Sequence, residues 1–381
     1  MKVAQIIPGL GICSGGPSRS VFDLTKGLRS IGIDASIYTN DDPSDPLLSK
    51  EHWIFAARYN KHRLWGYNPA FSKLIKSSSA DLFHIHSIYS YSSTIASHIA
   101  RKRGIPYIIA PRGSLYQSAL EISKWKKTIF NYLILNKDLN NSTLLHVTCK
   151  EEMRQIREMG IHIPIAIIPN SIHVHSLRAP VLNFEKKRLG YIGRISPIKN
   201  LESLVEAWYR SGLGFDNHYE LVFIGGSNSQ IERNYEAKLK RMASDYNLIN
   251  IRWEGFLFGH NKEDICRELS YTILPSFSEN FGMVVPESYL NGIPVIASKG
   301  TPWESLVDYN CGWWVEGNVD CLVSAILSAF SQTNDQRLAM IDRGREMVIN
   351  EYSTESVCSK MTILYNYILG GGDKPKFVFT D

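Results

Sequence analysis

The sequence predicts an α/β protein of two doubly wound domains, each built on a parallel sheet. Segments with strand and helix patterns alternate along the chain, which is typical of parallel strands joined by crossover helices. The 381 residues are too many for one ordinary hydrophobic core. A polar, irregular stretch that follows residue 171 and ends at Lys186 interrupts the alternation, and we interpret it as an interdomain linker.

The first domain is expected over residues 1–175. Six short apolar segments in it predict buried strands, and helical patterns fill most of the intervals between them. The predicted strands are Val3–Ile7, Ala35–Thr39, Leu82–His86, Tyr107–Ala110, Leu144–Thr148 and Ile165–Ile168. A loop rich in Ser, Pro and Asp is expected at residues 40–49.

The second domain is expected over residues 187–350, with the same alternation. Its predicted strands are Arg188–Ile192, Glu220–Ile224, Ile251–Trp253, Tyr271–Pro275 and Pro294–Ala297. Its predicted helices are Leu201–Tyr209, Ile231–Asp245, Lys262–Leu269 and one from Val284 to a cap at Gly292. A helix within residues 351–369 is expected to cross back to the first domain. Three glycines then predict a flexible tail, residues 370–381.

The composition is that of a globular protein, with 44% hydrophobic and 21% charged residues. No apolar run approaches about 18 residues, so no ordinary membrane span is predicted. The six cysteines include no C-x-x-C pair, which fits a reducing cytosol and gives no zinc site. The first residues resemble a buried strand rather than a signal peptide, so we expect a cytoplasmic protein.

Positive charge is concentrated in the first half of the chain. Residues 1–180 hold 22 Lys and Arg against 12 Asp and Glu, a net charge of +10, whereas the remainder holds 20 against 25, a net charge of −5. Two basic clusters lie at residues 101–103 and 124–127. They fit either solvated helix faces or a surface for a membrane or an anionic acceptor. No recognised nucleic-acid-binding module accompanies them.

Two glutamates around a predicted helix start are the most informative residues. Glu279 lies on the loop after the strand Tyr271–Pro275, and Glu287 lies eight positions later, within the helix that follows. In open α/β sheets, ligands bind at this carboxyl edge of the strands. Taken alone, an arbitrary glutamate on a helix is a solvated surface residue.

A second loop on the same predicted edge carries two cations. Arg194 and Lys199 follow the strand Arg188–Ile192 and lie five positions apart. A guanidinium offers a forked donor and an ammonium a compact charge, so together they suit a pyrophosphate. The alternative is a solvated loop whose cations pair with surface carboxylates.

Several motifs occur in a fixed order through the second half. They are Gly193-Arg194 with Lys199-Asn200, Ile224-Gly225-Gly226, Trp253-Glu254-Gly255, Leu274-Pro275-Ser276 with Glu279 to Gly282, Pro286-Glu287, and Gly292 to Val295. This ordered set resembles the donor-binding half of glycosyltransferase family 4, retaining enzymes of GT-B architecture. The first half is similar more loosely, through Gly15-Gly16, Asp81 to His86 and Pro169-Asn170-Ser171. Residues 110–114, 301–304 and 311–315 resemble the branch that builds bacterial surface polysaccharides such as O-antigen, capsule and exopolysaccharide.

The resemblance implies two Rossmann-like domains that face each other across a cleft, the first binding the acceptor and the second the nucleotide-sugar donor. Arg194 and Lys199 would hold the donor diphosphate and stabilise the leaving group, and Glu279 would bind the donor sugar. Glu287 would bind the ribose hydroxyls. The backbone of Phe281, Gly282 and Met283 would lie near the donor, and Gly15 and Gly16 would let the first domain approach its phosphate. No metal or other cofactor is expected.

Histidines and an arginine of the first half are further candidates. His84 and His86 share one face of a strand, and without a third ligand a structural pair is favoured over a metal site. Some relatives in the resembled family carry a histidine at the turn after the next strand, where this chain has Arg112. Arg112 therefore fits two alternatives equally: a structural arginine of the loop, or, with His86, a contact to a phosphate of the acceptor or the donor.

The implied activity is the retaining transfer of a hexosyl or N-acetylhexosaminyl group from a nucleotide sugar, expected to be a UDP-sugar, to a hydroxyl of a glycan. The acceptor is expected to be a glycan or a polyprenyl-diphosphate-linked saccharide, at the inner face of the cytoplasmic membrane. Two alternatives stay open: a sugar-nucleotide 2-epimerase of the same architecture, and a non-catalytic protein that binds nucleotide sugars. Nucleic acid is not an expected partner.

Overall fold

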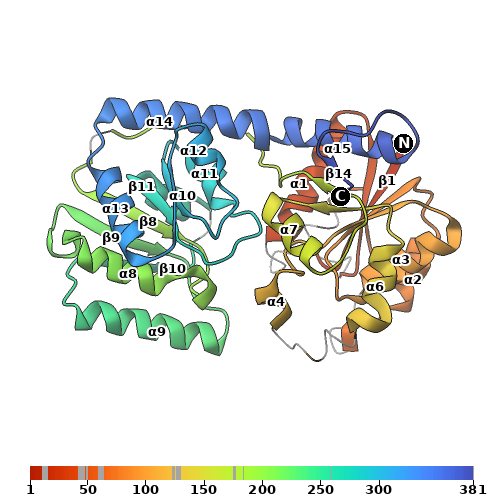
Figure 1. Cartoon of the computed structure of the whole chain (residues 1–381), viewed down its shortest axis with the longest axis horizontal. Helices are drawn as coiled ribbons and strands as arrows, with labels where there is room; N and C mark the ends of the chain where they lie inside the picture. The colour runs from red at the N-terminus through yellow and green to blue at the C-terminus, as the bar shows by residue number, and fades with distance from the viewer. Residues whose placement is uncertain are drawn as a thin grey trace. The chain divides into compact units, whose positions relative to one another are not determined.

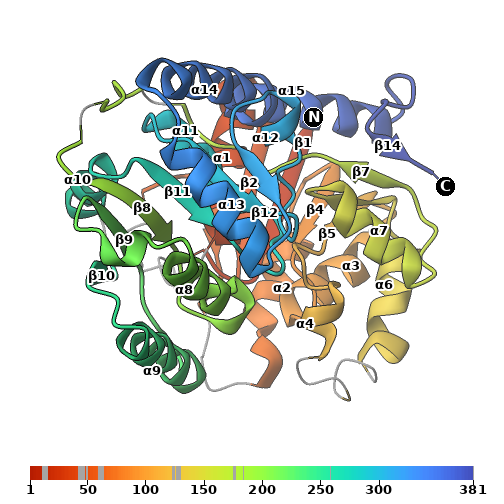
Figure 2. The same ribbon diagram turned by 60° about the vertical axis from the view of Figure 1, so that its left-hand side comes forward.

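The computed structural model describes residues 1–10, 16–41, 48, 50–58, 64–121, 125, 130–174, 177–182, 184–257 and 259–380. The chain forms two compact units: unit 1 comprises Met1–His173 and Tyr352–Asp381, and unit 2 comprises Val174–Glu351. Each unit has helices on both faces of one sheet (Figures 1 and 2). The predicted fold class is confirmed, because both sheets are wound from parallel strands and crossover helices.

The sheet of unit 1 has the strand order β14-β7-β6-β5-β4-β1-β2-β3. Its strands are β1 (Lys2–Ile7), β2 (Asp34–Thr39), β3 (Ile54–Ala56), β4 (Leu82–His86), β5 (Tyr107–Ala110), β6 (Leu144–Val147), β7 (Ile165–Ile167) and β14 (Val378–Phe379). The helices are α1 (Gly16–Ser30), α2 (Pro69–Lys76), α3 (Tyr91–Arg103), α4 (Gln117–Glu121), α6 (Asn136–Asn140), α7 (Lys150–Glu158) and α15 (Thr354–Ile368), with short turns η2 (Leu64–Gly66) and η3 (Asn131–Leu135). The six predicted strands of this half are all present.

Alternate residues of each strand in unit 1 face two different helix layers. Val3 packs on the side of α1 and α15, whereas its neighbour Ala4 packs on the side of α2, α3, α6 and α7. This follows from the two-residue period of a strand, which sends successive side chains to opposite faces. The C-terminal helix α15 thus completes one hydrophobic layer of unit 1.

The tail that was predicted to be flexible instead returns to the sheet. β14 pairs antiparallel with β7, and the Ile167 amide donates to the Phe377 carbonyl at 2.9 Å. The Val378 side chain is only 2% exposed. The three glycines allow the chain to turn. The edge strand β7 then offers backbone groups for pairing and an apolar surface for Val378, and the local composition of the tail does not indicate either contact.

The sheet of unit 2 is fully parallel, with the strand order β10-β9-β8-β11-β12-β13. Its strands are β8 (Lys187–Ile192), β9 (Tyr219–Ile224), β10 (Ile251–Gly255), β11 (Tyr271–Leu274), β12 (Val295–Ser298) and β13 (Trp313–Val315). Its helices are α8 (Leu201–Arg210), α9 (Gln230–Asp245), α10 (Gly259–Arg267), α11 (Val284–Leu290), α12 (Ser305–Asp308), α13 (Val319–Phe330) and α14 (Asn334–Met347), with short turns η4 (Pro197–Lys199) and η5 (Leu213–Phe215). A further turn, η6 (Val348–Tyr352), follows α14.

The order of strands in unit 2 reverses between β8 and β11. The chain winds outward from β8 through β9 to β10, with α8 and α9 on one face, and then crosses back to β11. α13 joins α8 and α9 on that face, whereas residues of α10 pack on the other face. The reversal makes β8 and β11 neighbours, so that the loops at their carboxyl ends leave in opposite directions.

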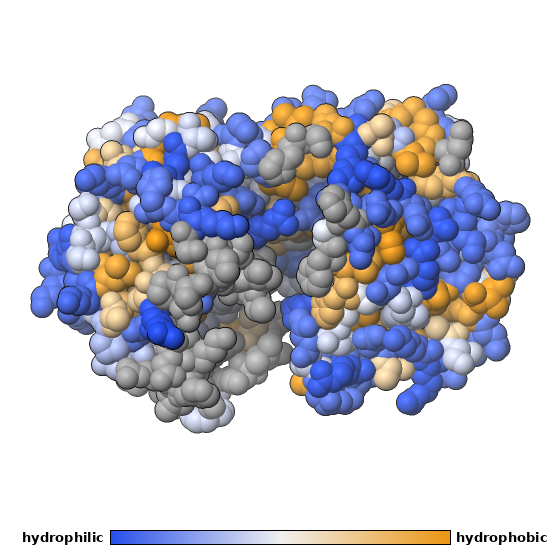
Figure 3. Space-filling model, turned by 180° about the vertical axis from the view of Figure 1, so that it is seen from behind, coloured by the Kyte–Doolittle hydropathy of each residue, from blue (hydrophilic) through white to orange (hydrophobic). Residues whose placement is uncertain are grey.

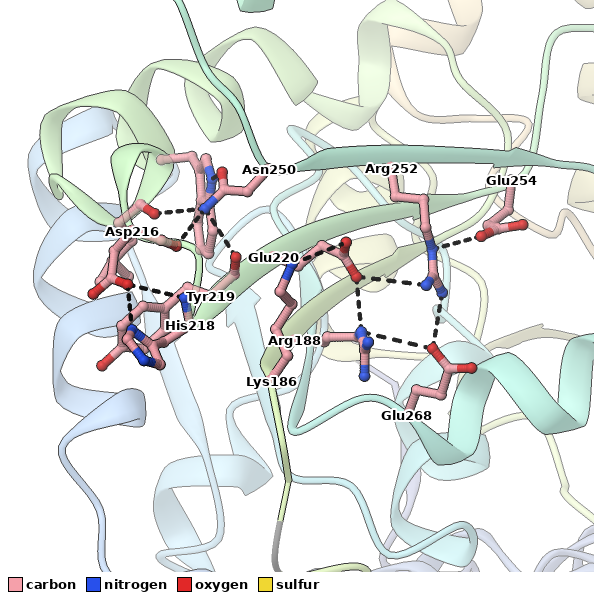
Figure 4. Close-up of polar contacts among 12 residues, drawn as sticks. Lys186, Arg188, Asp216, His218, Tyr219, Glu220, Asn250, Arg252, Glu254 and Glu268 are labelled. Atoms are coloured by element: carbon pink, nitrogen blue, oxygen red, sulfur yellow. Dashed lines mark hydrogen bonds and ion pairs between the residues drawn. The ribbon is translucent and has the colours of Figure 1, made fainter.

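A network of charged side chains ties together the amino ends of the unit 2 strands (Figure 4). Arg188 of β8 contacts Glu220 of β9 at 2.7 Å, and Arg252 of β10 reaches Glu220 at 3.5 Å and Glu268 at 3.1 Å. Each of these partly exposed pairs contributes little alone. Because acids and bases alternate within it, the network neutralises itself, and it lies at the edge opposite to the predicted site.

Hydrophilic residues cover most of the face seen in Figure 3, where the apolar residues form separate small patches. Within the described part of the chain, no helix has the length and apolar character needed to cross a membrane.

Candidate functional site

Unit 2 brings its two predicted loops together where the strand order reverses. The loop after β8 carries Lys199, the loop after β11 carries Glu279, and β8 and β11 are neighbours in the sheet. Lys199 Nζ forms an ion pair with Glu279 Oε1, which also accepts a hydrogen bond from Ser276 Oγ at 3.2 Å. The two charged side chains are 15% and 16% exposed, so a ligand can reach both. This reversal point is where ligands bind in doubly wound sheets.

Asn200 holds the Lys199 loop in place. It adopts the left-handed conformation, with φ 56°, and its buried amide donates to the carbonyls of Pro275 at 3.1 Å and Gly317 at 2.7 Å. The Phe277 amide donates to the Ile198 carbonyl at 2.9 Å and joins the same two loops. Sequence reasoning named Asn200 only as part of a motif. Its preference for positive φ is the signal that could have indicated a structural role.

Two glycines let the backbone close up beside this loop. Gly225 has φ 141°, and a Cβ atom built on it would lie 1.8 Å from the carbonyl oxygen of Gly193. Only glycine fits such an approach. The glycines therefore let the loops that follow β8 and β9 lie in direct backbone contact.

Arg194 does not join the Lys199–Glu279 pair. Its guanidinium contacts Glu232 of α9 at 3.0 Å, and its side chain is 58% exposed. Below it, the Tyr191 hydroxyl donates to the Arg194 carbonyl at 2.6 Å. Burial, reinforced by the charge of Glu279, raises the pKa of Tyr191 well above its ordinary value, so the hydroxyl remains a donor. The structure thus fixes the Arg194 backbone and leaves its side chain at the surface.

The segment from Phe281 to Met283 is shaped by packing beneath it. Gly282 has φ 85°, and an added Cβ would lie 2.7 Å from Leu274 Cδ2. Trp303 Nε1 donates to the Phe281 carbonyl at 2.5 Å, and the Phe281 ring is buried against the Trp303 indole. Phe281 can therefore offer only backbone to a ligand. Met283 caps the start of α11.

Glu287 lies one turn into α11 with its own cationic partner. Lys262 of α10 donates to Glu287 Oε2 at 3.2 Å, and both side chains are partly exposed. The two predicted carboxylates therefore occupy separate positions along the carboxyl edge, each beside a lysine. They do not form an acid and base pair in contact with each other.

In unit 1, the strand order reverses between β1 and β4. Gly15, on the loop after β1, lies outside the described residues, and Gly16 is the first residue of α1. Ser87 after β4 and Arg112 after β5 both have positive φ, at 70° and 55°. Such conformations are unfavourable for residues other than glycine and cluster at functional sites.

Arg112 and His86 are brought together at this edge. The Arg112 guanidinium donates to Asn170 Oδ1 and, at 3.0 Å, to His86 Nδ1. Glu152 accepts from the Gly113 amide at 2.6 Å and steadies the loop. Burial lowers the pKa of Arg112 to about 10, which leaves it charged at neutral pH. His86 is fully buried and accepts from Arg112, and its contact with a ligand stays a prediction.

A third buried histidine, His146 of β6, lies beside the predicted pair. His84 Nε2 contacts His146 Nδ1 at 3.1 Å, so the ring nitrogens bond to each other. Burial, with the charge of Arg112, lowers the pKa of all three histidines, that of His146 to about 3. Among the described residues no group of three or more His, Cys, Asp or Glu could hold a metal ion. His146 was missed because it looks like any polar residue within a short strand.

The stability of unit 1 is expected to fall in mild acid because of these histidines. Each has a folded-state pKa below the unfolded value of about 6.5, so the unfolded chain binds protons that the folded chain does not. The stabilisation is fully present above that pH and is lost as the pH falls toward the folded value, about 3 for His146. Each histidine contributes a slope of up to about 1.4 kcal/mol per pH unit. Urea unfolding at pH 7.5 and pH 5 measures this difference.

The control for this prediction is the exposed histidine of α3, changed in His98→Gln. This variant should show the same loss of stability between the two pH values as the wild type. In His146→Gln, the loss of unfolding free energy between pH 7.5 and pH 5 should be smaller by the contribution of one histidine. Equal unfolding free energies at pH 7.5 and pH 5 in the wild type would refute the assignment of neutral histidines.

Two family models match adjacent parts of the chain. The model of Glycosyltransferase Family 4 matches residues 14–176, and the model of Glycosyl transferases group 1 matches residues 177–347. The boundary between them lies close to the end of unit 1's first segment at His173.

Relatives of named activity are similar over different shares of the chain. The α-1,3/1,6-mannosyltransferase of Schizosaccharomyces pombe is 20% identical over 94% of this chain and 79% of that protein. The poly(ribitol-phosphate) α-N-acetylglucosaminyltransferase of Staphylococcus aureus is 27% identical over 62% of this chain. The match spans about half of that second relative, 46% of its length.

Solved structures share the fold across the whole chain. Sucrose-phosphate synthase from Thermosynechococcus elongatus has a TM-score of 0.73 at 19% identity, covering 97% of this chain and 99% of that one. HepE of Anabaena, solved with UDP and glucose, has a TM-score of 0.75 at 14% identity, covering 96% and 100%. With both family models and these folds in agreement, the chain belongs to the GT-B glycosyltransferase superfamily.

Proposed function

We propose that the protein is a retaining glycosyltransferase that moves a hexosyl or N-acetylhexosaminyl group from a UDP-sugar to a hydroxyl of a glycan acceptor. The observation that carries this proposal is the Lys199–Glu279 ion pair at the reversal point of unit 2. One group suits a diphosphate and the other suits sugar hydroxyls, and both are reachable from solvent.

Donor binding would exchange the partners of this pair. The diphosphate attracts Lys199, and Glu279 is then free to accept hydrogen bonds from the donor sugar. Arg194, already at the surface, can turn from Glu232 toward the same phosphates. The ligand must displace a carboxylate from each cation. The free energy of binding is therefore most favourable when the phosphate carries more negative charge than the carboxylate that it replaces.

In the transfer step, the bond from the anomeric carbon to the diphosphate oxygen breaks, and the electron pair leaves with the nucleoside diphosphate. The acceptor hydroxyl oxygen forms the new bond to that carbon on the same face, and its proton goes to the departing phosphate. Lys199 and Arg194 would stabilise the growing negative charge, an interaction stronger in the transition state than in the ground state. In this proposal the two cations serve where other enzymes use a divalent metal.

The comparisons support the choice of donor. HepE was solved with UDP and glucose, and a Staphylococcus aureus relative transfers N-acetylglucosamine to poly(ribitol-phosphate). Two carboxylates beside lysines, at different places along one edge, fit a donor with a sugar at one end and a ribose at the other.

For the acceptor, we propose a lipid-linked glycan of bacterial surface polysaccharide biosynthesis, met at the cytoplasmic face of the membrane. The excess positive charge of residues 1–180 favours an anionic partner. Unit 1 also contains a pocket of about 400 Å³, whose lining includes Trp65, Tyr91, His98, Lys137 and the Arg101–Asp138 ion pair. Aromatic walls with a few polar groups are typical of small-molecule sites of this size.

Replacing Lys199 with alanine should lower kcat for transfer about 10²- to 10³-fold, because a group that stabilises the leaving diphosphate is lost. Release of UDP from a set of UDP-sugars, with acceptor present, measures the rate. A chelator should leave wild-type turnover unchanged.

The matched control for Lys199→Ala is Lys238→Ala, which removes an exposed lysine that pairs with Glu202 in the same unit. It should transfer sugar at the wild-type rate. Full turnover by Lys199→Ala, with the thermal midpoint preserved, would rule out the site.

The role of Glu287 can be isolated with a modified nucleotide. Glu287→Gln should weaken UDP binding about tenfold, since a hydrogen bond to a charged acceptor is worth about 1.5–3 kcal/mol. It should weaken the binding of 2′-deoxy-UDP less, because one of the two ribose hydroxyls that would donate to Glu287 is already missing. Calorimetric titration of both nucleotides measures the four dissociation constants, with Glu206→Gln on α8 as the control. Equal losses for the two nucleotides would place Glu287 away from the ribose.

The acceptor proposal predicts that UDP release requires a polyprenyl-diphosphate-linked saccharide. The product should keep the anomeric configuration of the donor, as read by proton NMR. The protein should also sediment with anionic vesicles more than with neutral ones, and less so in high salt. A donor sugar that is epimerised without acceptor would favour the 2-epimerase instead, and binding without turnover would favour a non-catalytic protein.

A further inference from the structure

One side of the unit 1 sheet carries a row of polar side chains in an otherwise apolar core. Gln5 of β1, His84 and His86 of β4, and His146 of β6 all lie on the side of the sheet that faces α15. Tyr365 of α15 meets them from the helix. All five side chains are buried, so each polar atom must find a partner within the protein.

These side chains form one continuous chain of hydrogen bonds that begins at Arg112. Arg112 Nη2 contacts His86 Nδ1 at 3.0 Å, and His86 Nε2 contacts Gln5 Oε1 at 2.7 Å. Gln5 Nε2 contacts the Tyr365 hydroxyl at 3.0 Å, and that hydroxyl contacts His84 Nδ1 at 2.8 Å. His84 Nε2 contacts His146 Nδ1 at 3.1 Å, and His146 Nε2 contacts the Ile168 carbonyl at 2.8 Å.

The Arg112 end determines the direction of the first bonds. A guanidinium can only donate, so His86 Nδ1 must accept, and the proton of the neutral ring lies on Nε2. His86 therefore donates to Gln5, which presents its oxygen there and its amide nitrogen to Tyr365. The Tyr365 hydroxyl accepts from Gln5 and has one proton left, which it donates to His84 Nδ1.

The Ile168 end gives the same direction independently. A carbonyl can only accept, so His146 must donate from Nε2 and accept at Nδ1. His84 then donates from Nε2 and accepts at Nδ1 from Tyr365. Because both ends demand the same order, all three histidines hold their proton on Nε2, and protonating any of them would break a bond.

We propose that this ordered chain positions the Arg112 guanidinium for an anionic ligand, and that Tyr365 of the C-terminal helix is a positioning residue for it. The identity of the anion as a substrate phosphate rests on the proposed function. The hydrogen-bond order itself does not depend on it.

Arg112 needs such support because its own contacts are weak anchors. Its backbone is in the unfavourable left-handed region, and the two side chains that accept from its guanidinium, Asn170 and His86, are neutral. Its buried Nε has no hydrogen-bond partner among the described residues. The hydrogen-bond acceptors of the guanidinium thus carry no charge, although the negative charge of Glu152 acts on it from the neighbouring loop. A cation without a charged acceptor of its own suits a group that binds an anion.

Removing the Tyr365 hydroxyl would interrupt the chain of hydrogen bonds at its midpoint. In Tyr365→Phe, the Gln5 amide loses its acceptor and His84 Nδ1 loses its donor. Gln5 can then turn over, and His86 can move its proton to Nδ1, where it faces the Arg112 donor. The Arg112 guanidinium would then lose its hydrogen bond to His86, although Tyr365 does not contact Arg112.

Two measurements on the full-length protein test the proposal. Nitrogen-15 NMR of the imidazole rings distinguishes protonated from unprotonated ring nitrogens, and the wild type should show Nε2–H on all three buried histidines. Tyr365→Phe should lose the single protonation pattern of His86, whereas His146 and His84 keep theirs from the Ile168 end, and it should bind inorganic phosphate at least about fivefold more weakly. Both phosphate measurements are made in the Lys199→Ala background, so that the unit 2 cation expected to hold the donor diphosphate does not contribute; in this background Arg112→Gln should abolish the remaining phosphate binding.

The matched control is Tyr367→Phe, which changes a partly buried tyrosine of the same helix. It should keep both the histidine pattern and the phosphate affinity. If Tyr365→Phe does not fold, Gln5→Met interrupts the chain at the next link and should give the same two changes. A proton on Nδ1 of any of the three histidines in the wild type would overturn the order. Unchanged phosphate affinity after the pattern is lost would overturn the positioning role.

These outcomes are separable from the glycosyltransferase proposal. Loss of sugar transfer with an intact histidine pattern concerns the donor site alone. Conversely, the predicted pattern and phosphate affinity can hold even if no UDP-sugar is turned over.

Discussion

The parallel arrangement of strands, with one reversal of order in each sheet, is the constraint on which the site depends. At a reversal, the crossover connections of two neighbouring strands lead to opposite sides, so their loops separate and leave room at the carboxyl edge. In unit 2 that edge holds the Lys199–Glu279 pair, and in unit 1 the strand at the reversal, β4, carries His86 behind Arg112. The opposite edge of unit 2 is closed by charges that neutralise one another, so it has no free capacity for a charged ligand.

The two units treat positive charge differently. In unit 2, Lys199, Arg194 and Lys262 each contact a carboxylate, so an anionic ligand must displace an existing partner. In unit 1, the guanidinium of Arg112 donates to neutral groups and keeps its charge at neutral pH even though burial lowers its pKa to about 10. Displacement favours ligands with more charge than a carboxylate, whereas an anion that meets Arg112 has only neutral acceptors to displace.

Unusual backbone conformations support the loops at the carboxyl edges of both sheets. Asn200 and Arg112 occupy the left-handed region without being glycine, and each is held there by hydrogen bonds to neighbouring loops or strands. Gly225 serves the opposite purpose, because its missing side chain lets two loops touch. Conformations that a free chain would avoid are thus retained where hydrogen bonds between neighbouring loops and strands hold them.

The class of fold, and the edge on which Lys199, Glu279 and Glu287 lie, could be predicted from the amino-acid pattern. Buried parallel strands are short, nearly continuous apolar runs, so β4 and β5 could be predicted to the residue. The order of strands then places the following loops on one edge. The partners became known from the folded chain: Glu232 for Arg194, Lys262 for Glu287, His146 and Tyr365 for His84, and β7 for the tail. These contacts join residues from about 25 to almost 300 positions apart, and a local pattern of polar and apolar residues carries no information about which distant group will meet a given side chain.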